Sequence, residues 1–392
     1  MANQTLETVR IHPLLQPLWL LPCLVLGLLA CSKSGDTPAS ADEILVGEYG
    51  ALTGAMATFG LGNHKGVTMA VDAVNSAGGV LGKRIRIINE DTQGKPEEAQ
   101  TVVTKLITKD RVVAVIGENT SSNSLAAAPV CQSRGIPMIT PSATNPKVTE
   151  VGNYIFRVCF TDPYQGRVMA KFAASSLKLK DVAILRDVKS DYSVGLAGIF
   201  KENFTGMGGR IVGDEGYSQG DRDFTAQLTA LKGGKPQALF IPGYYTDVGL
   251  IARQARKLGL NAVLLGTDGW ESDKLWEVGG EALNGSFYST HFSPDDPSPT
   301  IRKFVEDYRA RYGSLPDANA VLAYDATMFL IDAIRRAGSA RPDSIRGALE
   351  ATKVFQGITG AITLDKNRNP IKPAVILEVK DGVRVFKEGV PP

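Results

Sequence analysis

The sequence predicts an α/β protein made of two Rossmann-like, doubly wound lobes. Strands and helices alternate from residue 44 to residue 140, and the same alternation begins again at residue 182 and runs to residue 265. Such an alternation specifies a parallel sheet with helices on both of its faces. The chain has 392 residues, of which 43% are hydrophobic and 21% charged, so its composition is globular and its length exceeds that of one ordinary domain.

Hydrophobic patterning locates the elements of the first lobe. The run 112–117 is short and almost wholly apolar, which is typical of a central parallel strand, and apolar residues recur at helical spacing in 95–110. A glycine-rich loop with Gly54, Gly60 and Gly62 is expected to lead from the first strand into the first helix. The predicted elements are strand 44–49, a helix through 67–74, strand 84–89, helix 95–110, strand 112–117, helix 125–134, strand 137–140 and strand 155–160.

The second series repeats this pattern and is followed by long helices. Its predicted elements are strand 182–185, helix 192–207, strand 210–217, helix 222–232, strand 238–241, helix 246–258 and strand 263–265. After residue 291, apolar residues at helical spacing predict a helix through 301–312 and another over 318–337. The last predicted elements are strands 361–364, 374–380 and 383–386.

Residues 1–30 are predicted to be an export signal. Arg10 precedes an apolar run, 14–30, which two prolines interrupt and which is short for a membrane span of about 20 residues. The run ends in Leu-Leu-Ala before Cys31, which resembles a bacterial lipobox, and a polar, flexible tether follows over 31–42. We therefore expect a lipoprotein whose acylated Cys31 becomes the new N-terminus. The alternative is an ordinary signal, with Cys31 incidental.

Export determines what the remaining cysteines can do. The mature protein is expected on the periplasmic or cell-envelope face, attached to a membrane only through its lipid. Cys131 and Cys159 would then lie in an oxidising compartment, where a disulfide can form. The sequence leaves two alternatives open, a bridge between them or two buried free thiols.

Several functional classes lack support in the sequence. The 43 basic residues are balanced by 41 acidic ones, so nucleic acid is not an expected partner. Three histidines and four cysteines leave little material for a metal site, and neither a metal nor a cofactor is expected. The glycines of 60–66 have one residue too many for a dinucleotide fingerprint, and 78–84 departs from a P-loop. Without a hydrolase or metalloprotease motif, we expect a protein that is not an enzyme and has no catalytic residues.

Polar segments follow two neighbouring strands of the first lobe. Residues 118–124 come directly after strand 112–117 and open a helix, and the hydroxyl-rich segment 140–146 lies at the end of the next strand. Ligands of open α/β sheets lie beyond the carboxyl ends of the strands, and a helix start with nearby hydroxyls suits a carboxylate. Each segment alone is better explained by helix capping or turn formation. Together they favour a site for the carboxylate of a free amino acid.

The second lobe has complementary segments at its own strand ends. Residues 243–247 follow strand 238–241, and 266–270 follow strand 263–265. Asp268 could accept hydrogen bonds from an ammonium group. The alternative role for Asp268 is to cap a helix that begins near Glu271.

These motifs resemble the substrate-binding proteins of branched-chain (Leu/Ile/Val) amino acid ABC transporters, which have the type I periplasmic-binding fold. The resemblance covers about the whole mature chain. It is carried by these segments: 52–54, 75–80, 116–117 with Ser121 and Ser122, 139–144, 156–157, Asp162 with Gln165 and Gly166, and 243–244. The resemblance implies two lobes that close on a ligand like a hinge, joined by three crossovers near residues 162, 291 and 371.

The resemblance also implies roles for individual residues. From the first lobe, Ser121, Ser142 and Thr144, with Ala143 between the last two, would hold the carboxylate and ammonium of the ligand. From the second lobe, Tyr244 and Asp268 would complete the ammonium site. The side-chain pocket would be lined by Phe59, Asn119, Thr120 and Tyr192. The family usually has glutamate in place of Asp268 and often tyrosine in place of Phe59.

The expected domain organisation follows from the same resemblance. Lobe 1 is predicted to comprise 43–162 plus 292–371, and lobe 2 to comprise 163–291 plus 372–392. The expected function is capture of an aliphatic, branched-chain amino acid and its delivery to the permease subunits of an ABC transporter. The alternative is a sensory or regulatory module that binds an amide or another small acid on the same fold.

Overall fold

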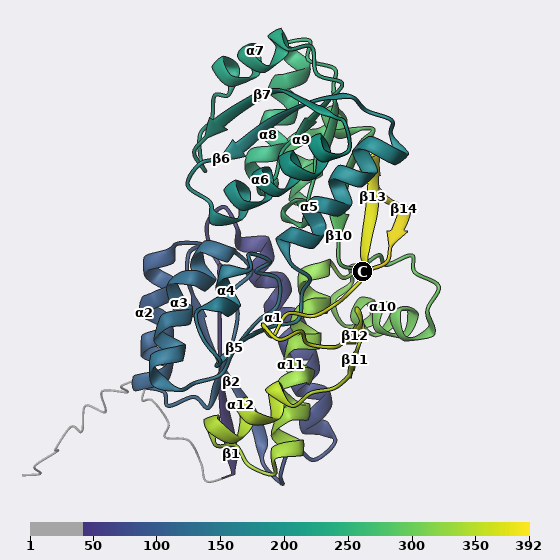
Figure 1. Ribbon diagram of the computed structural model, residues 1–392. Helices are drawn as coiled ribbons and strands as arrows, with labels where there is room; N and C mark the ends of the chain where they lie inside the picture. Colours follow the sequence, from purple (N-terminus) through teal and green to yellow (C-terminus); the bar gives the residue numbers. More distant parts are fainter. Residues whose placement is uncertain (1–41) are drawn as a thin grey trace, which may run out of the picture. The chain divides into compact units, whose positions relative to one another are not determined.

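Two β-sheets organise the part of the chain that the computed structural model describes, residues 42–392. The predicted signal segment, Cys31 and the tether up to residue 41 lie outside the described residues. Each sheet has helices on both of its faces, which is the doubly wound α/β architecture that the strand–helix alternation predicts (Figure 1).

The first sheet is parallel and has the strand order β2-β1-β3-β4-β5. In this order the winding direction reverses between β1 and β3, the point at which doubly wound proteins bind ligands. Its strands are β1 (Glu43–Gly50), β2 (Arg84–Asp91), β3 (Ala114–Ile116), β4 (Met138–Thr140) and β5 (Ile155–Arg157).

Helices cover the two faces of this sheet according to the alternation of side chains along its strands. Ile44 and Val46 of β1 pack with α1 (Ala57–Ser76) and α11 (Ala318–Ala337), whereas Leu45 faces α2 (Pro96–Thr108) and α3 (Ser121–Arg134). Figure 1 shows α1 and α11 side by side, away from α2 and α3. The remaining elements in this part of the fold are α4 (Lys147–Glu150), α10 (Pro299–Tyr312), α12 (Pro342–Glu350) and the strand pair β11 (Phe355–Gly357) and β12 (Gly360–Ile362).

The second sheet repeats the same winding and adds two antiparallel strands. Its order is β14-β13-β10-β9-β8-β6-β7, with β13 antiparallel to both β10 and β14. The strands are β6 (Asp181–Asp187), β7 (Arg210–Tyr217), β8 (Ala238–Phe240), β9 (Val263–Gly266), β10 (Ser286–Thr290), β13 (Ala374–Lys380) and β14 (Val383–Val390). The helices around it are α5 (Asp162–Lys171), which continues as a π-helical turn (Phe172–Ser176), α6 (Asp191–Gly206), α7 (Thr225–Gly233), α8 (Tyr245–Lys257) and α9 (Lys274–Gly279), with short 3₁₀ turns at Asp268–Trp270 and Gly280–Leu283.

The glycine-rich loop predicted after the first strand is wrong, because Gly60 and Gly62 lie inside α1. The glycines of α1 allow close packing of a helix. A Cβ at Gly60 would lie 2.1 Å from the carbonyl oxygen of Ala51, and one at Gly66 would lie 2.0 Å from that of Ala320 in α11. The absence of side chains there lets α1 approach both the end of β1 and α11.

The chain passes three times between the two sheets, and the three connections are in contact. Phe160 follows β5, and its ring stacks on the imidazole of His291, which follows β10, with the ring centroids 3.6 Å apart. In the third connection, Lys372 donates from Nζ to the carbonyl oxygen of Val158, 3.1 Å away. The three crossovers therefore lie together at the junction of the sheets.

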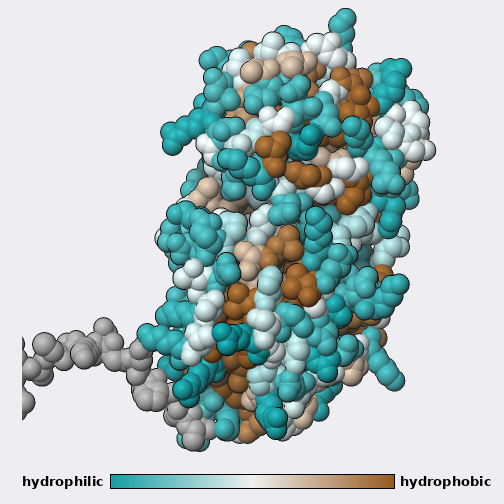
Figure 2. Space-filling view, turned by 60° about the vertical axis from the view of Figure 1, so that its left-hand side comes forward, coloured by the Kyte–Doolittle hydropathy of each residue, from teal (hydrophilic) through white to brown (hydrophobic). Residues whose placement is uncertain are grey.

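The surface of the described residues is mixed in polarity. On the face that Figure 2 shows, hydrophobic residues form small patches among hydrophilic ones. Within residues 42–392, none of the helices combines the length and the apolar character needed to cross a bilayer.

Candidate functional site

A cavity lies where strand ends of the two sheets meet, and it contains about 330 Å³ of space not filled by atoms. It is lined from the first sheet by residues that follow β3 and β4 and from the second by residues that follow β8, β9 and β10. Six of the predicted site residues line it: Phe59, Asn119, Ser142, Tyr192, Tyr244 and Asp268. The other lining residues are Gly269, Glu271, His291, Ala318, Asn319 and Leu322.

Asp268 is held at one end of this cavity by two neutral donors. The Tyr192 hydroxyl donates to Oδ1 of Asp268 over 2.7 Å, and Nε2 of His291 lies 3.1 Å from Oδ2. The Asp268 side chain is only 9% exposed. The helix-capping role considered for Asp268 is wrong, because the residue lies in a 3₁₀ turn, its side chain caps no helix, and α9 begins later, at Lys274.

His291 is a site residue that the sequence did not single out. It is buried, stacks on Phe160 and contacts Asp268. Burial lowers the pKa of His291 from its usual value, against the opposing effect of the Asp268 hydrogen bond. The imidazole is therefore neutral near pH 7, and its Nε2–H donates to the carboxylate. The only sequence signal was its position at the predicted second crossover.

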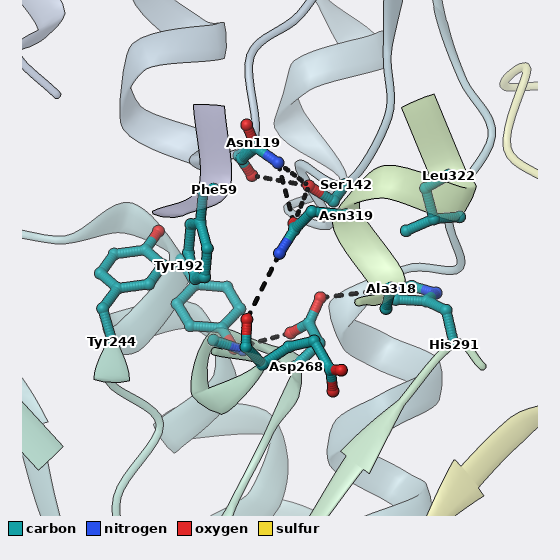
Figure 3. Close-up of a pocket in the computed structure, with 12 residues that line it drawn as sticks. Phe59, Asn119, Ser142, Tyr192, Tyr244, Asp268, His291, Ala318, Asn319 and Leu322 are labelled. Atoms are coloured by element: carbon teal, nitrogen blue, oxygen red, sulfur yellow. Dashed lines mark hydrogen bonds and ion pairs between the residues drawn. The ribbon is translucent and has the colours of Figure 1, made fainter. Parts of the chain in front are cut away.

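Aromatic rings form one side of the cavity (Figure 3). Tyr192 and Tyr244 stack with centroids 5.1 Å apart, and Phe59 meets Tyr244 and Tyr245 edge to face at 6.0 and 5.1 Å. Burial raises the pKa values of Tyr192 and Tyr244 well above their ordinary value, so both hydroxyls stay protonated and can donate. Phe59 comes from α1 and the tyrosines from the second lobe, so this wall joins the two lobes.

An amide cluster, defined as Asn63, Asn119, Ser142 and Asn319, lies at the opposite end of the cavity, and all of its members but Asn63 line it. Asn63 and Asn119 exchange two hydrogen bonds of 2.7 and 3.0 Å, and Asn119 Nδ2 also reaches Asn319 Oδ1 at 2.8 Å and Ser142 Oγ at 3.1 Å. Asn63 and Asn319 were not predicted, because they come from the helices α1 and α11 and not from strand ends. Figure 3 shows Asn119, Ser142 and Asn319 on the far side of the cavity from Asp268.

Four predicted site residues lie next to the cavity without lining it. Thr120 donates from its amide and hydroxyl to the buried Glu118 carboxylate, at 3.1 and 2.6 Å, which fixes the segment before α3. Ser121 Oγ accepts from the amide of Asn145 over 3.2 Å. The Ala143 carbonyl oxygen accepts from Arg157 over 2.7 Å.

Thr144, the fourth of these residues, borders a buried carboxyl group. Gln165 Nε2 lies 3.4 Å from Thr144 Oγ1 and 3.0 Å from Asp162 Oδ1. Burial raises the pKa of Asp162 to about 7. Ligand contacts for Thr120, Ser121, Ala143 and Thr144 stay predictions.

Hydrogen bonds between the lobes close the cavity on its outer side. Thr58 Oγ1 of α1 lies 3.0 Å from Ser272 Oγ, and Thr246 donates to the Ala55 carbonyl oxygen over 3.0 Å. On another side, Ser122 donates to the Asp191 carboxylate over 2.9 Å. The described structure is therefore a closed arrangement of the two lobes.

Metal ligands and reactive thiols do not accompany this cavity. Within residues 42–392, no three His, Cys, Asp or Glu side chains are grouped to hold a metal ion. Cys131 and Cys159 are both buried free thiols, so of the two alternatives left open above, the structure has the unbridged one. Burial raises the pKa of Cys159 to about 12 and that of Cys131 further still, which keeps both thiols protonated and unreactive.

Two doubly wound lobes that close aromatic, amide and carboxylate side chains around a small cavity define a solute-binding protein. The chain belongs to the periplasmic binding protein family, whose pattern matches residues 43–384. Members of this family are solute-binding proteins of ABC transporters and not enzymes. The predicted class and the type I periplasmic-binding fold are confirmed.

Individual relatives support the same assignment. A leucine-, isoleucine-, valine-, threonine- and alanine-binding protein of Pseudomonas aeruginosa is 32% identical over 328 residues, 83% of this chain and 87% of that protein. A solved leucine-binding protein of Thermotoga maritima is 39% identical with a TM-score of 0.86, covering 89% of this chain and 99% of that one. A substrate-binding protein of a branched-chain amino acid transporter from Streptococcus pneumoniae, solved with isoleucine, is 34% identical with a TM-score of 0.85. The match covers 89% of this chain and 100% of that one.

A more distant relative binds a different class of acid. A solute-binding protein of a Rhodopseudomonas palustris ABC transporter, solved with 3,4-dihydroxybenzoic acid, is 26% identical with a TM-score of 0.79, covering 89% of this chain and 98% of that one. The fold therefore accommodates acids that lack an ammonium group, and the ligand of this chain has to be argued from its own cavity.

Proposed function

We propose that this protein captures an α-amino acid of the branched-chain group between its two lobes and delivers it to an ABC permease. The observation that carries the proposal is the state of Asp268. Its carboxylate is nearly buried, and its two contacts are the hydroxyl of Tyr192 and the neutral imidazole of His291. Among residues 42–392, no lysine or arginine lies within ion-pair distance of it. A desolvated carboxylate with neutral partners is stabilised by a cationic ligand group.

The first lobe would hold the other end of the amino acid. Ser121, Ser142, Ala143 and Thr144 follow β3 and β4, and they would take the carboxylate with hydroxyl and backbone donors. Ser121 stands at the first residue of α3, where backbone N–H groups and the helix dipole favour an anion. The Tyr244 hydroxyl would complete the ammonium site beside Asp268.

The remaining predicted residues would shape the pocket for the side chain of the ligand. Phe59, Asn119 and Tyr192 line the cavity, and Thr120 stands next to it in the segment that Glu118 fixes. Pairs of aromatic rings offer a large apolar surface to an aliphatic side chain.

Capture would involve opening and closing of the lobes about the three crossovers. We assign 43–162 plus 292–371 to lobe 1 and 163–291 plus 372–392 to lobe 2. The bonds that close the cavity, such as Thr58 to Ser272, are few and lie near the surface, so they can break without loss of either core. A ligand that contacts both lobes would bind the closed arrangement more tightly than the open one. This difference in affinity would favour closure.

The exported protein would be tethered by a lipid on Cys31. The support is the Leu-Leu-Ala-Cys sequence and the polar segment after it, and two or more acyl chains give stable attachment where one gives a marginal one. In cell fractionation, Cys31→Ala protein should leave the membrane fraction. If it stays there as the wild type does, the lipoprotein proposal is wrong.

A second candidate is a sensory or regulatory module for a small acid or an amide. Aromatic rings on one wall of the cavity, and the transporter relative solved with 3,4-dihydroxybenzoic acid, favour the small-acid ligand of this candidate. Such ligands carry no ammonium group, so Asp268 would not contribute to their binding.

Calorimetry separates the ligand classes of these two candidates. The purified protein should bind amino acids of the branched-chain group and show no measurable binding of benzoate or simple amides. Binding of an aromatic acid with no response to any amino acid would refute the proposed function.

A further inference from the structure

We infer that the side-chain end of the cavity recognises a short polar side chain, a hydroxyl or a carboxamide, in preference to an aliphatic side chain of the same shape. This inference rests on the proposed capture of an α-amino acid between the lobes and replaces the aliphatic side chain of that proposal by a polar one of similar shape. It is carried by the amide cluster of Asn63, Asn119, Ser142 and Asn319, which stands where an aliphatic ligand would be matched by an apolar floor.

The amide cluster has more hydrogen-bonding capacity than it uses. Asn119 Nδ2 carries two hydrogens but has three acceptors at 2.8 to 3.1 Å: Asn319 Oδ1, Asn63 Oδ1 and Ser142 Oγ. One of these acceptors therefore has room for another donor at any moment. All four cluster residues are buried, so bulk water does not supply that donor.

Asn319 is the member of the cluster that presents both kinds of capacity to the cavity. Its Nδ2 makes one long contact, 3.4 Å to the Glu271 carbonyl oxygen across the lobes, and no second acceptor for it lies among residues 42–392. Its Oδ1 accepts from Asn119 Nδ2 over 2.8 Å and, with its second lone pair, from Ser142 only over 3.4 Å. When Ser142 turns its hydrogen to the ligand carboxylate, as proposed, Asn319 has both a free N–H and a free lone pair.

The ligand group that matches one donor and one acceptor is a hydroxyl or a carboxamide. A methyl group in the same place would leave the Asn319 N–H with only its long contact to Glu271 and the second lone pair of Oδ1 unused in a closed cavity, which is unfavourable. Phe59 and Leu322 flank this end (Figure 3), and the Asn319 carboxamide lies across it, 3.4 Å from the Glu271 carbonyl oxygen, so a short side chain suits it. No charged residue belongs to the cluster, which disfavours a charged side chain.

Threonine and valine give the sharpest test because they have the same shape and differ by one hydroxyl in place of one methyl. A site built to hydrogen-bond a hydroxyl rejects the analogue that lacks it much more strongly than an apolar pocket rejects an added hydroxyl. We expect the full-length protein to bind threonine at least tenfold more tightly than valine by isothermal titration calorimetry. Leucine and alanine complete the panel.

The outcomes separate the inference from the proposed function. If valine binds as tightly as threonine or more tightly, the inference is overturned, whereas the proposed function stands. If no amino acid of the panel binds, the proposed function fails and the inference falls with it.

Variants assign the preference to Asn319. Asn319→Leu has similar volume and no carboxamide, and it should reduce the threonine-to-valine ratio to about one or below. Asn261→Leu makes the same change at an exposed site after α8 and should leave the ratio unchanged. If Asn319→Leu does not fold, Asn319→Ala removes the carboxamide without adding bulk, and the wild-type ratio tests the inference on its own. An unchanged ratio in a folded Asn319 variant would overturn the assignment.

Discussion

Replacing Asp268 by asparagine removes one charge from the cavity and little else. The Oδ1 atom of the new side chain can still accept from Tyr192, whose hydroxyl donates to Oδ1 of Asp268 over 2.7 Å in the wild type. His291 can accept from the new amide at Nε2 by carrying its proton on Nδ1 instead. The shape of the site and its hydrogen bonds are therefore kept, and a change in ligand binding would report on the charge itself.

The magnitude follows from the burial of Asp268. Its side chain is 9% exposed, and two opposite charges about 4 Å apart at an effective dielectric constant of about 20 interact by about 4 kcal/mol. Removing one partner of a desolvated charge pair costs about 2–5 kcal/mol. We expect a loss of about 3 kcal/mol, which corresponds to a roughly 150-fold rise in Kd at about 1.4 kcal/mol for each factor of ten.

Stopped-flow release of a bound amino acid measures this loss, since interface truncations act mainly on the dissociation rate. Asp273→Asn is the matched control, because it makes the same change five residues away on a side chain that is 80% exposed. Release should be at least tenfold faster in Asp268→Asn and unchanged in the control. Wild-type release from Asp268→Asn would refute the reasoning that the ligand ammonium pairs with this carboxylate.

Three further predictions follow from buried groups and close contacts. Because burial lowers the pKa of His291 below 6.5, acid should protonate it only below that pH, where the imidazolium would pair with Asp268 and weaken amino-acid binding. His291→Gln should flatten that dependence in calorimetry, and an equal pH dependence in both proteins would contradict this role. Burial raises the pKa of Asp162 from 3.8 to about 7, so the folded state binds the proton more tightly than the unfolded chain and stability falls as pH rises from about 4 to 7. Asp162→Asn should therefore raise the free energy of unfolding at pH 8, by up to about 4 kcal/mol, and with it the melting temperature. At pH 4 the substitution should have little effect. Equal effects at both pH values would be inconsistent with a charged, buried Asp162. A Cβ at Gly66 would lie 2.0 Å from the Ala320 carbonyl oxygen, whereas one at Gly198 in α6 meets nothing within 4 Å. Urea unfolding should show Gly66→Ala destabilised by about 2 kcal/mol or more and Gly198→Ala stabilised by about 0.5–1 kcal/mol, and a harmless Gly66→Ala would contradict the close packing of α1 on α11.

Most of the fold could be predicted because its strands are short apolar runs between amphipathic helices. The run at β3, for example, is buried on both faces, and the pattern of the sequence shows this directly. β10 was missed because Ser286–Thr290 is mostly polar and is buried only through its position between β9 and β13. The start of α1 was missed because glycines that allow close helix packing look the same in sequence as glycines of a loop.

The candidate site could be predicted in part for a similar reason. Residues at strand ends, such as Ser142 and Asp268, converge by topology, and six of the predicted residues line the cavity. Asn319 enters it from the first turn of α11, Asn63 stands behind it inside α1, and His291 enters from a crossover. Their positions depend on how helices and lobes pack, and local sequence patterns carry no information about that packing.

The central claim is that an α-amino acid is bound between the lobes with its ammonium group on Asp268. Calorimetry with valine and with 3-methylbutanoate, which has the same carbon skeleton and carboxylate but no ammonium, tests this claim most directly. A site that pairs the ammonium with a nearly buried carboxylate should bind valine at least a hundredfold more tightly, because the analogue leaves that carboxylate unpaired. Equal affinity for the two compounds, or tighter binding of 3-methylbutanoate, would contradict it.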